Sequence, residues 1–286
     1  SDCFTINSDN VYLDCHGNTI KYPYGVGSST GAGDSWASNP NGSAIKIINS
    51  SNVFLKECNI VEIGNSSSDE NYAVYVIGGN NITIIDSNIS NNNSASIFFD
   101  YGSDGEYNLI NSNINSSTFR GIETDPDVWS KGTLNFYNYL DLVIKDDQMN
   151  PLKGALVVIT DKNGDEVFFG FSDINGKIEV VLKDYSESYL VNPDGVNYTF
   201  NPYTINVSKS GFDPYSQSVG VEETVELDVV LTDCIDCGCV NNEDCDDGFY
   251  CNGAEYCDGN NDCQAGTTVD CSDGVGCTDD SCNEVI

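Results

Sequence analysis

The sequence predicts an all-β protein of three successive domains, and three observations carry this prediction. Short apolar runs recur along the first half of the chain, each followed by Asn, Ser, Asp and Gly. Strict alternation of apolar and polar residues then marks a second segment, and ten of the thirteen cysteines lie after residue 233. We therefore predict domains at 1–138, 139–232 and 233–286.

The first segment repeats an apolar run at intervals too long for a hairpin. The intervals are 42, 29, 25 and 27 residues, and the runs begin at Val11, Val53, Ile82, Tyr107 and Leu134. Three of the runs lead into similar sequels, at 57–60, 86–89 and 111–114. A repeat of this size without helical periodicity is typical of one coil in a stacked solenoid. Asn suits the turns because it tolerates left-handed backbone.

The opening phrase of the chain carries a family resemblance. Residues 3–7 and 10–20, CFTIN and NVYLDCHGNTI, resemble the first coil of surface proteins from archaea and bacteria with the pectate-lyase-like fold. The resemblance covers about half of the chain and implies a right-handed parallel β-helix over 1–138. The long first interval predicts a loop that leaves the stack at about 22–43.

The second segment reads as a small β-sandwich. Period-2 runs are separated by turn signals such as Asn163-Gly164 and Asn175-Gly176, and the runs lie at 140–144, 155–159, 167–169, 178–182, 203–207 and 225–231. The phrases PLKGA (151–155), SDING (172–176) and VSKSGF (207–212) resemble the carboxypeptidase regulatory-like domain, a transthyretin-like sandwich. That resemblance implies an accessory or spacer module without an active site.

The third segment is almost free of aliphatic residues, so disulfides must hold it together. Two units, 244–251 and 270–277, align and resemble Cys-rich repeats of large bacterial and archaeal surface proteins. No signal peptide is visible and the chain stops soon after Cys282. We therefore expect a mature or trimmed piece of a longer protein.

The cysteine content predicts disulfides formed in an oxidising compartment. The ten C-terminal cysteines allow five bridges of open connectivity. Of the other three, Cys3 and Cys15 are the favoured pair because they flank one coil turn, and Cys15–Cys58 across stacked coils is the alternative. The odd cysteine could bridge to another segment or subunit. The predicted disulfide cysteines are Cys3, Cys15, Cys234, Cys237, Cys239, Cys245, Cys251, Cys257, Cys263, Cys271, Cys277 and Cys282. Zinc on the first three of the cluster is the disfavoured rival.

The glycosylation acceptor pattern N-x-S/T fits an exported glycoprotein at the cell surface. Nine asparagines carry the pattern: Asn41, Asn49, Asn65, Asn81, Asn88, Asn92, Asn115, Asn197 and Asn206.

The charge of −34 excludes two partner classes and favours one ion. A field of this sign repels nucleic acid and anionic membranes, and no apolar run is long enough to span a membrane. It attracts cations, and Ca²⁺ suits clustered carboxylates. The candidate calcium ligands are Asp244, Asp246, Asp247, Asp270 and Asp273, with simple solvation as the rival interpretation. A weaker group is Asp100, Asp104 and Glu106, and the loop 161–165 is favoured as a hairpin turn. We expect no organic cofactor.

Catalytic signals are weak, so we predict that the chain is not an enzyme. Arg120, the single arginine, stands beside Glu123, Asp125 and Asp127, which fits a salt bridge better than a lyase site. His16, the single histidine, sits in the turn phrase CHGN, and no Gly-x-Ser-x-Gly motif accompanies it.

These signals favour an extracellular structural protein: a subunit of a surface filament, surface layer or adhesive appendage that associates with itself or with other surface proteins. The alternatives are a polysaccharide-binding adhesin, with Tyr22, Tyr24, Trp36 and Trp129 as sugar platforms, or a β-helix carbohydrate-active enzyme. A contiguous groove of aromatic and acidic side chains would favour the alternatives.

Overall fold

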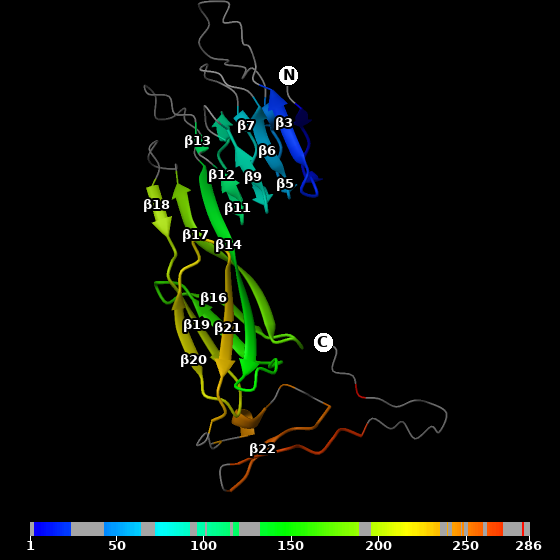
Figure 1. Ribbon diagram of the computed structural model, residues 1–286, viewed down its shortest axis with the longest axis vertical. Coiled ribbons are helices and arrows are strands. Elements are labelled where there is room, and N and C mark those ends of the chain that lie inside the picture. The colour runs from blue at the N-terminus through cyan, green and yellow to red at the C-terminus, as the bar shows by residue number, and fades with distance from the viewer. Residues whose placement is uncertain are drawn as a thin grey trace, which may run out of the picture. The chain divides into compact units, whose positions relative to one another are not determined.

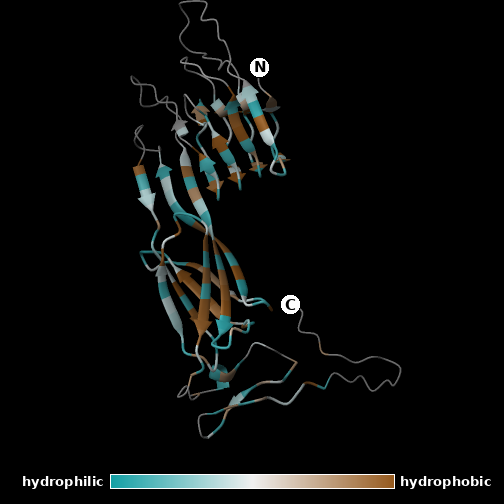
Figure 2. Ribbon diagram, viewed as in Figure 1, coloured by the Kyte–Doolittle hydropathy of each residue, from teal (hydrophilic) through white to brown (hydrophobic). Residues whose placement is uncertain are grey.

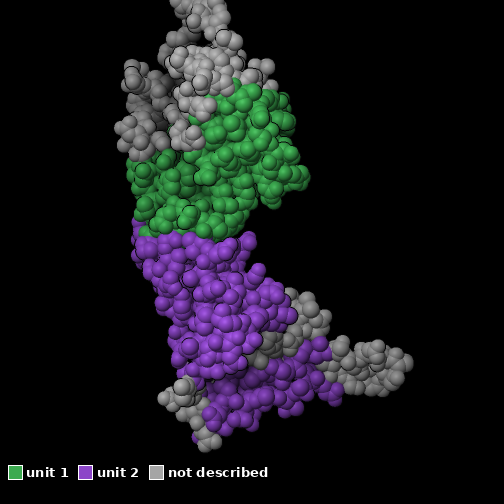
Figure 3. Space-filling view, in the orientation of Figure 1, with its two compact units in different colours: residues 1–139, 181–201, 221–224 green, residues 140–180, 202–220, 225–286 purple. Residues whose placement is uncertain are grey.

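The computed structural model describes an all-β chain (Figure 1). The described residues are 3–23, 43–63, 72–91, 96–100, 102–114, 117–119, 132–188, 196–234, 239, 242–246, 248, 251–259, 262–270 and 282. Two compact units divide the chain (Figure 3). Unit 1 holds residues 1–139, 181–201 and 221–224, and unit 2 holds 140–180, 202–220 and 225–286.

Over residues 4–138 of unit 1, parallel strands form three sheets, and every third strand returns to the same sheet. The first sheet is ordered β1 (Phe4–Ile6), β4 (Ser43–Ile48), β7 (Tyr72–Ile77), β10 (Ile97–Asp100) and β13 (Ser117–Phe119). The second runs β2 (Tyr12–Asp14), β5 (Val53–Lys56), β8 (Ile82–Ile85), β11 (Glu106–Ile110) and the start of β14 (Thr133–Asp146). The third runs β3 (Thr19–Pro23), β6 (Asn59–Ile63), β9 (Asn88–Ser90) and β12 (Asn113–Ile114). Three consecutive strands thus make one coil.

The coils share a core because equivalent apolar residues stack in register. Ile45 of β4 pairs with Val74 of β7, which pairs with Ile97 of β10, and all three are buried. Burying an aliphatic side chain of this size contributes roughly 1.5–3 kcal/mol. Figure 2 shows the apolar strands of unit 1 lying side by side. The repeat in the sequence is therefore a repeat of core positions.

Asparagines at the turns explain the Asn-rich composition. Asn10, Asn52 and Asn81 occupy equivalent turns between the first and second sheets with φ of 60°, 57° and 52°. The Asn52 amide donates to Asn10 Oδ1 at 3.0 Å, and the Asn81 amide donates to Asn52 Oδ1 at 2.6 Å. Asn therefore supplies both the left-handed backbone and a ladder from coil to coil.

One glycine permits a close backbone approach between coils. Gly79 has φ of 98°, and a Cβ added there would lie 2.1 Å from the Ser50 carbonyl oxygen. A side chain at this position would force neighbouring coils apart.

A disulfide joins the first two coils, and it corrects the favoured prediction. Cys15 pairs with Cys58, with the two Cα atoms 4.9 Å apart, while Cys3 is a free, exposed thiol. The Cys3–Cys15 pairing is wrong because Cys3 precedes β1 in the first sheet. Cys15 and Cys58 instead follow the paired strands β2 and β5 and come together as the coils stack. In the chain-entropy model, a loop of this length gives about 4 kcal/mol.

Two sets of strands precede the C-terminal segment in unit 2, and buried residues alternate with more exposed ones along several of them. One is ordered β16 (Glu166–Phe171), β15 (Leu156–Thr160), β19 (Tyr203–Ser208) and β20 (Tyr215–Val219). The other contains the second half of β14 paired with β21 (Val225–Leu231), and the first half of β17 (Lys177–Ser188). Each predicted strand of this segment is present. The predicted boundary at 138/139 falls inside β14, which runs through it without a break.

The described part of the C-terminal segment contains η1 (Asn242–Cys245), β22 (Tyr256–Cys257) and β23 (Cys263–Gln264). Bridges between described cysteines join Cys239 to Cys257, Cys245 to Cys263, and Cys251 to Cys282. Across the described residues, no helix has the length and apolar character needed to cross a membrane.

Candidate functional site

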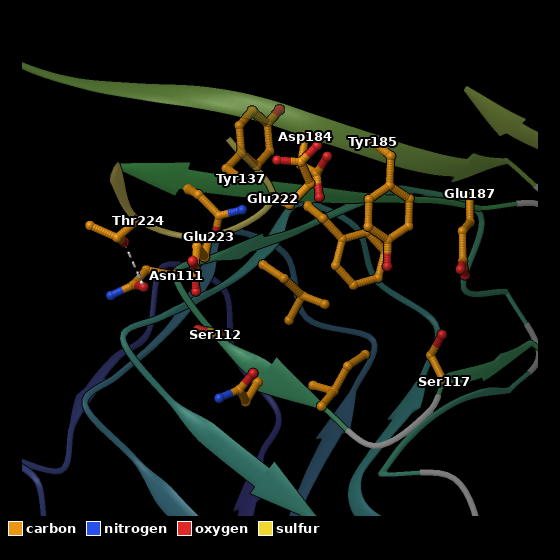
Figure 4. A pocket seen from close by; sticks show the side chains of 15 residues that line it. Asn111, Ser112, Ser117, Tyr137, Asp184, Tyr185, Glu187, Glu222, Glu223 and Thr224 are labelled. Carbon is orange, nitrogen blue, oxygen red and sulfur yellow. Dashed lines mark hydrogen bonds between the residues drawn. The ribbon is translucent and has the colours of Figure 1, made fainter. Parts of the chain in front are cut away.

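A groove of about 590 Å³ lies within unit 1, where the coil stack ends (Figure 4). The third sheet stops at β12 in the described part of the chain, whereas the second sheet continues with β14. After Tyr137 and Asn138, the chain runs on along β14 instead of turning into a further strand of the third sheet. The lining residues surround the position which that strand would occupy.

The floor of the groove is apolar and aromatic. Leu109 of β11, Ile114 of β12, Phe136 of β14 and Tyr185 of β17 form it. The rings of Phe136 and Tyr185 stack at 4.1 Å between centroids and 11° between planes. Each ring therefore covers one face of the other.

The rim carries carboxylates, and the described residues of the lining include no basic side chain. Asp184 and Glu187 come from β17, and Glu222 and Glu223 come from the segment that precedes β21. Figure 4 shows Asp184 and Glu222 close together on one side, with Glu187 on the other. Burial raises the pKa of the Asp184 carboxyl, and the charge of Glu222 raises it further, against a hydrogen bond from Asn201. Burial together with Glu187 and Asp184 raises the pKa of Tyr185 to about 12.

Hydrogen bonds fix the segment that carries Glu222 and Glu223. The Asn138 amide donates to the Val221 carbonyl oxygen at 2.7 Å, and the Val221 N–H donates to Asn201 Oδ1 at 2.9 Å. At the other end, the Thr224 hydroxyl donates to Asn111 Oδ1 at 3.0 Å. The acidic rim is therefore tied to the last turn of the coil stack.

Lys183, a basic residue near the groove, contacts side chains outside the groove and the ring of Tyr137. Lys183 Nζ donates to Asn135 Oδ1 at 3.1 Å and lies 5.3 Å from the centroid of the Tyr137 ring and 5.1 Å from that of Phe200. Burial lowers the pKa of this ammonium group. Lys183 thus packs beside aromatic rings and is absent from the groove lining.

His16 lies in a turn, as expected, but the turn joins β2 to β3 within the first coil and does not connect two coils. Its φ is 49° and its side chain is 79% exposed, 3.4 Å from Asp14 Oδ1. Asp14, His16 and Glu57 offer ligand atoms within 4.8 Å of one another. Glu57 already pairs with Lys56 at 3.1 Å, and Asp14 accepts from the His16 N–H. These contacts account for the proximity of the three side chains.

Two of the three cysteines in the zinc alternative, Cys234 and Cys239, form disulfides. Cys239, Cys245 and Cys257 lie close together, but each belongs to a disulfide, and Cys234 is also disulfide-bonded. Cys237, Cys271 and Cys277 lie outside the described residues.

The predicted calcium residues are placed only in part. Asp244 lies in η1, Asp246 accepts from the Gly248 N–H at 2.9 Å, and Asp270 is exposed. Asp247 and Asp273 lie outside the described residues, so this calcium site stays a prediction. The loop 161–165 is a turn between β15 and β16, where Asp161 Oδ1 accepts from the N–H groups of Asn163 and Asp165. In the weaker group, Asp100 is buried and accepts from the Tyr75 hydroxyl, whereas Asp104 and Glu106 are exposed.

Five of the nine predicted glycosylation acceptors are described, and all five are exposed: Asn49, Asn81, Asn88, Asn197 and Asn206. Exposure is what a glycan acceptor needs, and glycosylation itself stays a prediction. Asn41, Asn65, Asn92 and Asn115 lie outside the described residues.

The aromatic sugar platforms are corrected at one position. Tyr22 is only 1% exposed and belongs to the core of the coil stack, so it cannot present a ring to a ligand. Tyr24, Trp36, Trp129 and the Arg120 cluster lie outside the described residues, as does most of the predicted loop at 22–43.

Sequence patterns missed the groove because its residues come from distant parts of the chain. Asn111, Phe136, Tyr185 and Glu222 span more than a hundred residues of the chain. One signal was present: the third sequel, 111–114, has no fourth copy after the run that begins at Leu134.

Comparisons with known proteins give partial structural likenesses only. No protein-family model and no curated protein sequence matches the chain. A shaft pilin from Lactobacillus rhamnosus GG has a TM-score of 0.26 and 11% identity, over 33% of this chain and 47% of that one. The major pilin subunit BcpA of Bacillus cereus has a TM-score of 0.25 and 18% identity, over 34% and 28%. A 3-chlorocatechol 1,2-dioxygenase from Rhodococcus opacus has a TM-score of 0.23 and 13% identity, over 34% and 60%. The chain thus spans less than half the length of both pilins.

Proposed function

We propose that the chain is an extracellular structural protein, a subunit of a cell-surface filament, surface layer or adhesive appendage. The observation that carries this proposal is the way coils are tied together. A disulfide joins the first two coils, and asparagine ladders and stacked apolar residues repeat the same links from coil to coil. Such a stack suits a stiff, protease-resistant element outside the cell, where disulfides persist.

In this proposal the coil stack is a right-handed parallel β-helix over 1–138. The segment 139–232 acts as a β-sandwich spacer and 233–286 as a disulfide-held module. Support comes from the three parallel sheets, from the alternating burial in unit 2, and from the three bridges near the C-terminus. The proposed role does not include catalysis.

Electron microscopy of native material tests the proposal. Material purified without reductant is examined by negative staining and mass photometry, with a reduced sample beside it. We expect regular filaments or sheets that fall apart on reduction. Uniform single particles at all concentrations, with and without reductant, would count against a polymer subunit.

The groove favours a second candidate, a polysaccharide-binding adhesin or a β-helix carbohydrate-active enzyme. Aromatic and acidic residues line one wall together with amides and hydroxyls, as in many ligand sites. A glycan array and an assay for newly released reducing ends test this candidate. Binding or cleavage that the Asp184→Asn variant loses would replace the structural proposal.

A further inference from the structure

We propose that the groove of unit 1 binds an extended polypeptide segment of another protein that carries lysine or arginine beside apolar side chains. This site belongs to unit 1 alone. It goes beyond the structural role and stands whether or not copies of the chain form filaments.

The strand beside the groove has an unpaired edge in the described part of the chain. The Asn113 N–H donates inward to the Ser87 carbonyl oxygen at 2.8 Å, on the side of β9. In a parallel sheet, the next residue directs its N–H and C=O to the opposite side. The backbone groups of Ile114 therefore face the groove, where an extended chain can pair with them.

The floor selects an apolar side chain between the charged ones. Ile114 is half-buried at the end of a row in which its equivalent in the previous coil, Ile89, is fully buried. Phe136 and Tyr185 continue this apolar surface across the groove. A strand laid beside β12 would cover Ile114 as β12 itself covers Ile89.

The rim selects basic residues in the same segment. Asp184, Glu222 and Glu223 bring three carboxylates to the groove, and the described residues of its lining include no lysine or arginine. The charge of Glu222 raises the pKa of Asp184, so the two carboxylates repel each other. An ammonium or guanidinium group near them would relieve this repulsion.

In this groove, the charge of the rim and the stacked rings match a basic peptide better than a glycan. Acidic sugars meet carboxylates of the same sign. Neutral sugars bind to open aromatic faces, but Phe136 and Tyr185 cover each other at 4.1 Å. A basic peptide satisfies both the charge of the rim and the shape of the edge.

Fluorescence polarisation of the whole chain with a labelled peptide tests the proposal. The probe is a heptapeptide of alternating lysine and isoleucine, and its control has glutamate in place of lysine. A third peptide carries N-methyl groups on alternate residues, which blocks one hydrogen-bonding edge. We expect saturable binding of the first peptide and at least tenfold weaker binding of the other two.

Matched variants separate the groove from the net charge of the protein. Glu222→Gln with Glu223→Gln removes two rim charges, and Glu179→Gln with Glu226→Gln removes two exposed charges from unit 2. We expect the rim pair to weaken binding at least threefold and the control pair to change it less than twofold. Equal weakening by both pairs, equal binding of the N-methylated peptide, or binding of neutral oligosaccharides in place of the peptide would overturn the proposal.

Discussion

At single positions, the turn residues of the coil stack combine a backbone role with a side-chain role. Asn52 has φ of 57°, donates to Asn10 and accepts from Asn81. A left-handed backbone costs an ordinary L-residue roughly 1–2 kcal/mol, and Gly avoids that cost. The two roles can therefore be separated by substitution.

We expect Asn52→Ala to destabilise the chain by about 2–3 kcal/mol, because it loses both hydrogen bonds and strains the turn. Asn52→Gly should cost about 1 kcal/mol less, since it loses only the hydrogen bonds. Denaturant unfolding measures both. Equal losses for Ala and Gly would show that the backbone conformation contributes nothing.

Acid stability at single positions depends on turn carboxylates in unit 2. The backbone N–H of Lys177 donates to Asp173 Oδ1 at 2.7 Å and, with the N–H of Asn175, lowers the pKa of that carboxyl. The Asn150 side chain and backbone do the same for Asp146. A folded-state pKa below the unfolded value means that the carboxylate stabilises the fold above the unfolded pKa. This contribution is lost as pH falls through the folded pKa.

We therefore expect thermal stability to fall as pH drops below about 4, the usual range for Asp. In Asp173→Asn this loss should be smaller, because the titrating group is gone while an acceptor oxygen remains. Asp147→Asn removes an equal charge from another exposed turn and serves as the control. Identical acid profiles for Asp173→Asn and the wild type would contradict the assignment.

At the scale of elements, neighbouring coils are held by links that the sequence shows only as repeated phrases. Position 58 carries a disulfide to Cys15, and the Cys58 N–H donates to the Ser87 hydroxyl oxygen at 3.0 Å. The Ser87 N–H in turn donates to the Ser112 hydroxyl at 3.0 Å. One row of side chains thus runs from a covalent link at the first coil to hydrogen bonds at the later ones.

Removing the covalent link tests how much the first coil depends on it. We expect Cys15→Ser with Cys58→Ser to lower the free energy of unfolding by about 2–4 kcal/mol, because the unfolded chain regains loop entropy. Cys3→Ser should change stability by less than about 0.5 kcal/mol, since it alters an exposed, free thiol. If Cys3→Ser were as destabilising as the double variant, the pairing would be wrong.

Much of the strand content could be predicted from the sequence, and the reason lies in particular elements. Strands can be predicted at Ile82–Ile85 and Val225–Leu231 because β-branched and aliphatic residues are enriched on the buried face of a pleated sheet. The partner of Cys15 and the groove could not be predicted. Both depend on which residues the coils bring together, and a local pattern does not predict a contact across a sequence separation of 43.

At the scale of the whole molecule, charge dominates the solution behaviour. Because the net charge is −34, the carboxylates within the folded chain repel one another. We expect the melting temperature to rise when NaCl increases from about 10 mM to 150 mM, because the Debye length falls from roughly 30 Å to 8 Å. A scan over several salt concentrations measures this screening.

Calcium separates a specific site from general screening. At matched ionic strength, we expect millimolar Ca²⁺ to raise the melting temperature above the value in NaCl or MgCl₂, and chelation to reverse the gain. A triple variant in which the predicted ligands Asp244, Asp246 and Asp270 are replaced by Asn should lose this extra stabilisation by Ca²⁺. Equal melting temperatures in Ca²⁺ and Mg²⁺ would show that screening of charge accounts for all of the stabilisation, without a specific calcium site.

The disulfide pattern of native material tests most directly whether the chain is a coil stack made for an oxidising, extracellular setting. Free thiols are alkylated before proteolysis, and linked peptides are identified by mass spectrometry without reduction. We predict Cys15 linked to Cys58, Cys239 to Cys257 and Cys245 to Cys263. Fully alkylated cysteines would contradict an extracellular role, and a Cys3–Cys15 link would contradict the stacking of the first two coils.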